Sequence, residues 1–183
     1  MMSTTHAAIG ATAAALVVPL APELASVAAL GAIAGGLFPD LDVLAEHRKT
    51  LHYPEHYWFL TVPALSLAVA VPGVWTVVTA AFFGSAALHS TIDVLGGGLG
   101  LRPWISDDDR GVYSHWNGRW LRARRWVRYD GAPEDLLVVA IFTVPPLLVF
   151  DGPVRTVVAA GLAVSTVYTA IRRRLPDVYE ALV

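Results

Sequence analysis

The chain has 183 residues, of which 55% are hydrophobic and only 15% are charged, with a mean hydropathy of +0.55. A soluble domain has about 25% charged residues, so the composition indicates one integral-membrane domain spanning residues 1–183. The absence of cysteine excludes disulfides, thiolate metal sites and cysteine nucleophiles, and the net charge of -2 gives no general attraction to nucleic acid.

Apolar stretches in chain order predict an all-α polytopic membrane bundle. Proline and glycine between successive stretches indicate tight turns, which would pair the helices into three hairpins. Several stretches are shorter than the roughly 20 residues of an ordinary span. We therefore predict about six apolar helices and a polar cytoplasmic segment at 95–133. The stretches cover residues 5–21, 24–38, 57–71, 74–94, 134–150 and 153–171.

The distribution of basic residues predicts the sidedness of these helices. Three arginines, Arg172 to Arg174, follow the last apolar stretch and place the C-terminus in the cytoplasm by the positive-inside rule. Counting back through six spans puts twelve of the thirteen Lys and Arg residues on the same side, with Arg155 as the exception. The sequence thus predicts a multi-pass cell (inner) membrane protein with both termini in the cytoplasm. The alternative is a soluble all-α bundle with unusually apolar helices.

Histidines and aspartates gather at the predicted cytoplasmic ends of these helices. His89 and Asp93 are spaced i, i+4, which places them on one helical face. Asp40 and Asp42 follow Pro39 and need a turn-like backbone to converge, and two acids so close would repel without a cation or proton between them. Alone, each pair could be an ordinary polar helix end. Their shared side predicts one metal site.

The segment between the second and third stretches adds further candidates. His52 and His56 have helical clamp spacing, but Pro54 intervenes, so we expect His52 in a loop and His56 in the first turn of the next helix. His47 and Arg48 precede them, and Arg48 could hold a phosphate bidentately. His6 opens the first stretch, where a lone histidine is more often an interfacial residue than a ligand.

Residues 95–133 form the largest polar segment. Its glycines lack the Gly-Lys-Ser/Thr of a phosphate-binding loop. From Trp116 to Tyr129, aromatic residues alternate with arginines, a composition typical of the headgroup zone of anionic lipid. Membrane lipids are therefore the expected partners, and nucleic acid is not expected. The arginines are Arg119, Arg122, Arg124, Arg125 and Arg128.

The order of these motifs resembles the YdjM-like family, which comprises LexA-binding, inner-membrane-associated proteins described as metal-dependent hydrolases. The resemblance covers most of residues 1–105: His6, Pro-Asp-x-Asp at 39–42, His47-Arg48, and His89-x-x-x-Asp93 before Arg102-Pro103-Trp104. The family pattern His-Arg-Gly-x-Thr-His-Ser differs here at Lys49, Leu51 and Tyr53. More remotely, the His/Asp spacing is similar to that of zinc-dependent phospholipase C.

The resemblance and the motifs together predict a membrane-bound metal-dependent hydrolase acting at the cytoplasmic interface, with a lipid or lipid-linked phosphoester as substrate. His47, His56 and Arg48 are the predicted catalytic residues, while Arg102 is expected to neutralise phosphate. Zinc is favoured because imidazole and carboxylate suit it. The alternatives are a non-catalytic metal-binding membrane protein, a transporter, or a structural protein whose polar side chains diverge. The predicted metal ligands are His6, Asp40, Asp42, His52, His89 and Asp93.

Overall fold

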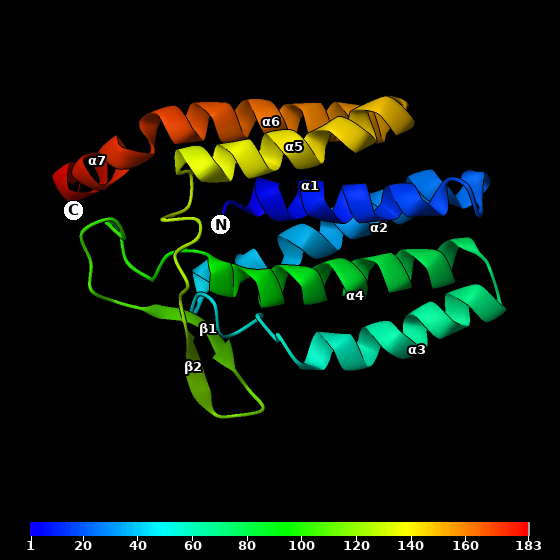
Figure 1. Ribbon diagram of the computed structural model, residues 1–183, viewed down its shortest axis with the longest axis horizontal. Helices are drawn as coiled ribbons and strands as arrows, with labels where there is room; N and C mark the ends of the chain where they lie inside the picture. The colour runs from blue at the N-terminus through cyan, green and yellow to red at the C-terminus, as the bar shows by residue number, and fades with distance from the viewer. Residues whose placement is uncertain (183) are drawn as a thin grey trace.

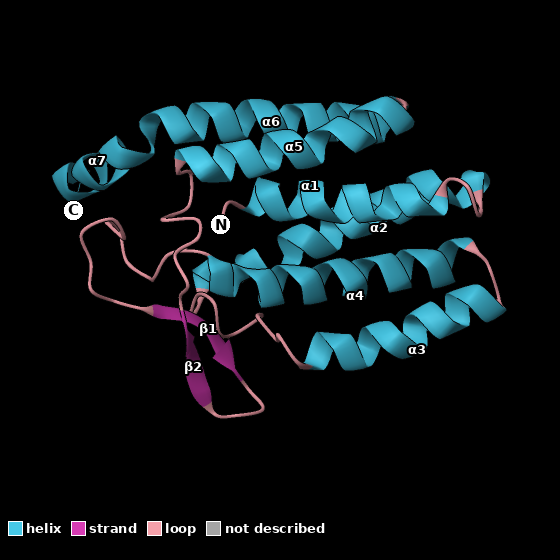
Figure 2. Cartoon of the chain, in the orientation of Figure 1, coloured by secondary structure: helices cyan, strands magenta, loops and turns pink. Residues whose placement is uncertain are grey.

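Alpha-helices form most of the structure, a computed structural model that describes residues 1–182 (Figures 1 and 2). The prediction of a mainly helical chain is confirmed. Prolines occupy the first turns of α2, α5 and α6, where a missing N–H costs no hydrogen bond. The helices are α1 Ser3–Ala14, α2 Pro22–Leu37, α3 His56–Ala70, α4 Val74–Ile92, α5 Pro133–Val149, α6 Gly152–Ile171 and α7 Leu175–Leu182.

Small residues allow α2 and α4 to pack with their backbones in close contact. A Cβ atom at Gly31 would lie 2.9 Å from the carbonyl oxygen of Val78, and one at Gly35 would lie 2.1 Å from that of Phe82. The two glycines are four residues apart on α2 and face two residues four apart on α4. This is the small-xxx-small packing common between membrane helices. This packing fixes the position of α4 along the axis of α2, and with it the position of His89.

Three helices are long and apolar enough to cross a membrane: Pro22–Leu44, Val74–Leu95 and Gly152–Leu182. Each includes the short 3₁₀ helix that continues it, and the last also includes α7. The helix His56–Ala70 is apolar but shorter. In Figure 1, α1 to α6 run roughly side by side, and the N-terminus lies at the same end as the C-terminus. This arrangement is compatible with membrane association.

A β-hairpin departs from the all-α prediction. Strand β1 (Arg110–Ser114) pairs antiparallel with β2 (Arg119–Arg122), with Tyr113 opposite Trp120 and Ser114 opposite Arg119. The strands are only five and four residues long, and their arginines and aromatic residues are equally typical of a segment in the lipid headgroup zone. The sequence therefore did not predict them. Cross-strand packing of Tyr113 on Trp120, with ring centroids 5.5 Å apart, stabilises the pair.

The hairpin lies at the end of the bundle that carries the candidate site, beside the C-terminal end of α4 (Figure 2). Its first strand holds the loop between α2 and α3. The Tyr113 N–H donates to the carbonyl oxygen of Arg48 at 3.0 Å, and His115 Nε2 donates to that of Lys49 at 2.7 Å. The polar segment 95–133 therefore positions the backbone around His47 to His52.

Candidate metal centre

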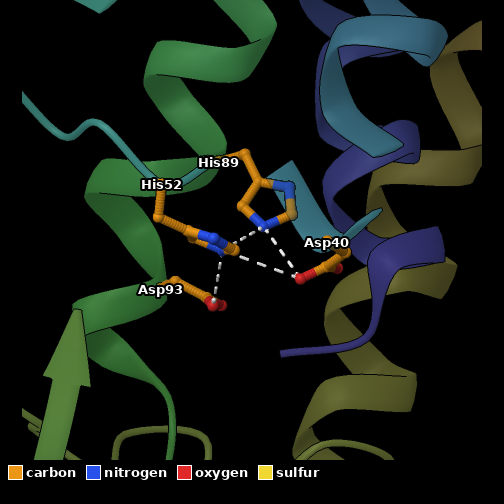
Figure 3. A group of neighbouring side chains, drawn as sticks. All are labelled: Asp40, His52, His89 and Asp93. Carbon is orange, nitrogen blue, oxygen red and sulfur yellow. Dashed lines mark hydrogen bonds and ion pairs between the residues drawn. The ribbon is translucent and has the colours of Figure 1, made fainter. Parts of the chain in front are cut away.

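Four side chains from three parts of the chain point toward a common centre (Figure 3). Asp40 comes from the 3₁₀ helix Phe38–Leu44 that follows α2, His52 from the loop before α3, His89 from the last turn of α4, and Asp93 from the turn just after α4. One ligand-type atom from each lies within 4.8 Å of all the others. Such a cluster could hold a metal ion.

Four of the six separations inside the cluster are short and similar. His52 Nε2 lies 3.2 Å from His89 Nε2, 3.6 Å from Asp40 Oδ1 and 3.7 Å from Asp93 Oδ2. His89 Nε2 lies 3.4 Å from Asp40 Oδ1. His52, His89 and Asp93 are at most 1% exposed, so solvent does not screen the two carboxylates from each other. Arg48 and the Met1 amine offset part of their repulsion at Asp93, and a cation or a proton at the centre would offset more of it.

Both histidines are oriented by hydrogen bonds at Nδ1, on the side of the ring that faces away from the centre of the cluster. His52 Nδ1 donates to Asp42 Oδ2 at 2.8 Å, and His89 Nδ1 donates to the carbonyl oxygen of Gly36 at 2.6 Å. A carbonyl oxygen can only accept, so the His89 proton must reside on Nδ1. The Nε2 lone pair of His89 therefore faces the centre, as in histidines that ligate metals through Nε2.

Asp42 stabilises this site from outside it. Its carboxylate accepts from His52 and, at 2.9 Å, from His47 Nδ1. It also accepts three backbone N–H groups, from Arg48, Lys49 and Leu51, at 3.2–3.3 Å. Asp42 is 1% exposed, and both its oxygens are occupied by these donors. In this geometry it orients His52 and folds the loop, rather than serving as a ligand.

Asp93 is the most heavily paired residue of the four. Its Oδ1 accepts from His6 Nε2 at 2.9 Å and from the Met1 amine at 2.8 Å, whereas its Oδ2 faces the centre and forms an ion pair with Arg48 Nε at 3.0 Å. The His6 ring stacks on His89 with centroids 3.6 Å apart. His6 thus supports both Asp93 and His89 but lies beside the four-residue cluster.

The electrostatics of the loop favour a positive charge at the centre. Burial alone would lower the pKa of His52, but the hydrogen bond to Asp42 and the negative charges of Asp42 and Asp93 raise it to about 9. Protonated His52 donates through both ring nitrogens, to Asp42 and toward His89 Nε2. A proton on His52 therefore provides the same compensation that a bound cation would provide.

The remaining predicted residues lie either at the edge of the site or outside it. His47 lies at the edge of the site, with 37% of its side chain exposed, and Arg48 is buried against Asp93. His56 begins α3, as expected from Pro54, but its ring contacts Tyr53, His115 and Trp116 instead of the cluster. Arg102 also lies outside the site.

Arg102 forms exposed ion pairs with α7, through Asp177 at 2.7 Å and through Glu180. These two acids lie three residues apart on α7 and bind one guanidinium group. Arg102 therefore ties the loop after Asp93 to the C-terminal helix, which leaves it outside the predicted phosphate-binding role.

Three contributors were not predicted from the sequence, and one of them is the Met1 amine that binds Asp93. The Ser3 hydroxyl donates to Asp40 Oδ2, which orients the carboxylate toward the cluster. The carbonyl of Gly36 accepts from His89. Ser3 lies three residues before His6, on the same face of α1, so helical spacing is a signal that could have found it. A backbone carbonyl leaves no such signal.

A cavity of about 800 Å³ opens beside the cluster and reaches it at Asp40. Asp40 is also the most exposed of the four ligand-type residues, with 14% of its side chain accessible. His47 and Arg48 also line the cavity. Apolar side chains line other parts of its wall: Met2, Val43, Leu99, Leu101 and Val164.

Comparison of the chain with models of protein families, with curated proteins and with solved structures found no match. The resemblance to the YdjM-like family therefore stays a prediction. The chemistry of the site has to be inferred from its own residues and their geometry.

Proposed function

We propose that this protein is a multi-pass membrane metal-dependent hydrolase that acts on phosphoester bonds of lipids at the cytoplasmic face. One observation carries the proposal. His89, with its proton fixed on Nδ1, directs its Nε2 lone pair at the same buried point as His52 Nε2 and the carboxylates of Asp40 and Asp93. Such a group of acceptors needs a positive species, which is the His52 proton in the metal-free protein and would be a metal ion that displaces this proton.

Charge placement supports a membrane topology with α1 to α6 as spans. The charged residues of these helices all lie in their first turns, namely Glu23, Glu134, Asp135 and Arg155. On α3, the apolar residues Phe59, Val62, Leu65 and Val69 recur at helical spacing and are each more than half exposed. A stripe of this kind costs free energy in water and fits a bilayer. A soluble bundle offers no reason for it.

Zinc fits the donor set better than a hard cation does. Two imidazoles and two carboxylates suit zinc, which usually takes four ligands at about 2.0–2.2 Å. Ligand atoms at the corners of such a tetrahedron lie about 3.3–3.6 Å apart. The four separations of 3.2–3.7 Å around His52 and His89 lie close to this range. Asp40, His52, His89 and Asp93 would hold the ion, which when bound supplies Lewis acidity and an activated water.

The neighbouring side chains supply the remaining functions of a phosphoester hydrolase. Arg48 is held by Asp93 and by the carbonyl of Gly97 through Nε and Nη1, and neither contact uses its Nη2. Because Arg48 lines the cavity, this group would neutralise a phosphate there. His47 is partly exposed and bonded to Asp42, so its free ring nitrogen would carry a proton to or from the leaving oxygen. His56 has no part in this proposal.

A transporter is the weaker alternative. Transporters hold their ions near the middle of the membrane, on ionisable side chains or broken helices. Here the cluster lies at the helix ends, and in the described part of the chain the helix interiors carry no charged residue.

Hydrolysis of a phospholipid panel tests the proposal. Purified protein supplied with zinc should release product from at least one phosphoester lipid, and EDTA should abolish this activity. Added zinc should then restore it, because the four ligand residues remain in place. The proposal fails if the zinc-loaded protein leaves every phosphoester lipid intact, or if EDTA has no effect on turnover.

Metal binding should depend on pH through His52. At neutral pH the metal-free protein carries a proton on His52, whose pKa is about 9, and a metal at Nε2 must displace it. Metal affinity should therefore rise roughly tenfold per pH unit between about 7 and 9. Calorimetry in two buffers of different ionisation enthalpy should report release of about one proton per metal at pH 7.

The stability of the EDTA-treated protein should follow the opposite trend. A raised folded-state pKa means that the His52 charge stabilises the fold fully below its unfolded value of about 6.5, and that this contribution disappears as the pH rises through about 9. Thermal unfolding of the stripped protein at pH 7 and pH 9.5 measures the loss. A metal affinity that does not change between about pH 7 and 9 would contradict the assignment of His52 as a ligand.

A further inference from the structure

A second cavity shares the lining residue Thr4 with the first and is mostly apolar, with Thr4 and Thr143 as its polar lining residues. It measures about 190 Å³ and is lined by residues of α1, α2, α5 and α6, none of them charged. Leu37 on α2 and Val157 on α6 line it and are 38% and 44% exposed, so the cavity lies near the outer surface of the helices. We call it the apolar crevice. Its other lining residues include Ala8, Ile33, Val158, Gly161 and Leu162.

One face of α6 and of the 3₁₀ turn that follows it lines first the apolar crevice and then the large cavity. Val157, Val158, Gly161 and Leu162 border the apolar crevice, whereas Ser165, Tyr168 and Arg172 border the large cavity beside the cluster. From Val157 to Arg172 this face covers fifteen helical steps, or about 22 Å at 1.5 Å per residue. Its polarity increases along that length, and it ends at Arg172, which is paired with Asp130 at 2.8 Å.

Thr4 marks the place where the two cavities meet. It lines both of them, and its hydroxyl is hydrogen bonded to Ser165 at 2.7 Å. Gly161 lies beside this junction, since a Cβ atom built on it would find only Thr4 Cγ2, at 3.9 Å. The glycine at 161 thus leaves space in the apolar crevice next to Thr4, and the Thr4–Ser165 pair lies between the crevice and the large cavity.

We propose that these two neighbouring cavities bind one membrane phospholipid, with the headgroup phosphate in the large cavity near Asp40 and Arg48 and an acyl chain in the apolar crevice. The two cavities match a phospholipid in polarity. The cavity with charged lining residues lies next to the cluster, where the headgroup would bind, and the apolar crevice would hold the acyl chain. The exposed apolar flanks, Leu37, Val157 and Val164, would face bilayer lipid and admit a chain from the side. The headgroup part of this inference rests on the proposed function, while the acyl-chain part does not.

Filling the crevice from α6 tests the acyl-chain site. The probe is a phosphatidic acid with a diazirine on one acyl chain, photolysed with EDTA-treated protein in nanodiscs. Cross-links should concentrate on peptides covering residues 33–37 and 157–165. Gly161→Leu should reduce them at least about fivefold, equivalent to about 1 kcal/mol of lipid-binding free energy, because the leucine side chain would occupy space that the acyl chain needs.

Two further variants control for folding and for bulk. Gly161→Ala should cross-link like the natural protein, because its Cβ reaches only an ordinary contact with Thr4. Ala163→Leu adds bulk to the exposed, outward side of the same helix and should also have no effect. If Gly161→Leu lowers the thermal stability in detergent, Val157→Phe fills the crevice from its exposed rim and replaces it in the comparison.

The inference is overturned if cross-links spread evenly over the lipid-facing helices, or if both crevice-filling variants label like the natural protein. Because EDTA is present throughout, the result does not depend on hydrolysis. Crevice labelling together with inactive zinc-loaded protein would refute the proposed function and retain the acyl-chain site. Hydrolysis without crevice labelling would support the proposed function and refute the acyl-chain site.

Discussion

His89→Ala should abolish stoichiometric metal binding. His89 Nε2 lies within 3.4 Å of both His52 Nε2 and Asp40 Oδ1, so its removal takes away one of four ligand atoms and leaves the carbonyl of Gly36 without its donor. Loss of a supporting residue around a metal ligand lowers affinity about 10–100-fold, so loss of the ligand itself should cost at least about 100-fold. Elemental analysis after zinc loading and gel filtration measures the metal-to-protein ratio.

His56→Ala is the matched control for this variant. His56 was also predicted from the sequence as a site residue, yet its ring lies against His115 and Trp116. Its replacement removes the same side chain from outside the cluster and should leave the bound metal at the natural ratio. The site would be contradicted if the two variants retained zinc equally, or if the natural protein retained no zinc after loading and gel filtration.

Asp42→Asn should damage both the loop and the metal site. The carboxylate accepts five donors while nearly fully buried, and an asparagine offers one acceptor oxygen and adds an N–H₂ group that faces other donors. Removing one partner from a buried charged network costs about 3–5 kcal/mol. Metal affinity should also fall about 10–100-fold, because His52 loses the partner that orients it. Denaturation in detergent and zinc titration measure the two effects.

Glu46→Gln is the control for this second prediction. Glu46 belongs to the same loop but is exposed, and its ion pair with Lys49 is an ordinary surface contact. Exposed pairs of this kind contribute about 0–1 kcal/mol, so neither stability nor zinc affinity should change much. If Asp42→Asn proves as mild as Glu46→Gln, Asp42 does not organise the site.

The candidate cluster was predictable in part because its members share a helical face or a loop. The i, i+4 spacing placed His89 and Asp93 together, and the structure brings both into the cluster. The same type of reasoning could not separate Asp40 from Asp42. In the 3₁₀ helix they approach His52 from opposite sides of its ring, Asp40 toward Nε2 and Asp42 at Nδ1. Which acid faces which nitrogen depends on the fold of the loop.

The β-hairpin shows a second limit of sequence reasoning. Periodicity over four or five residues is a weak signal, and the arginines and tryptophans of residues 110–122 suit a lipid surface as well as a strand. The hairpin forms because Tyr113 and Trp120 pack together and because its first strand binds the backbone of Arg48. Neither contact is visible in the local sequence.

The sequence by itself determined the helical character of this protein, the apolar nature of its helices and the gathering of histidines and aspartates at their ends. These follow from composition and spacing, which act through local backbone preference and the hydrophobic effect. Only the tertiary structure decided that Asp40, His52, His89 and Asp93 form the cluster while Asp42 and His6 support it. The physical reason is that hydrogen bonds at distances near 3 Å depend on how α1, α2 and α4 pack, and that packing rests on contacts distant in sequence.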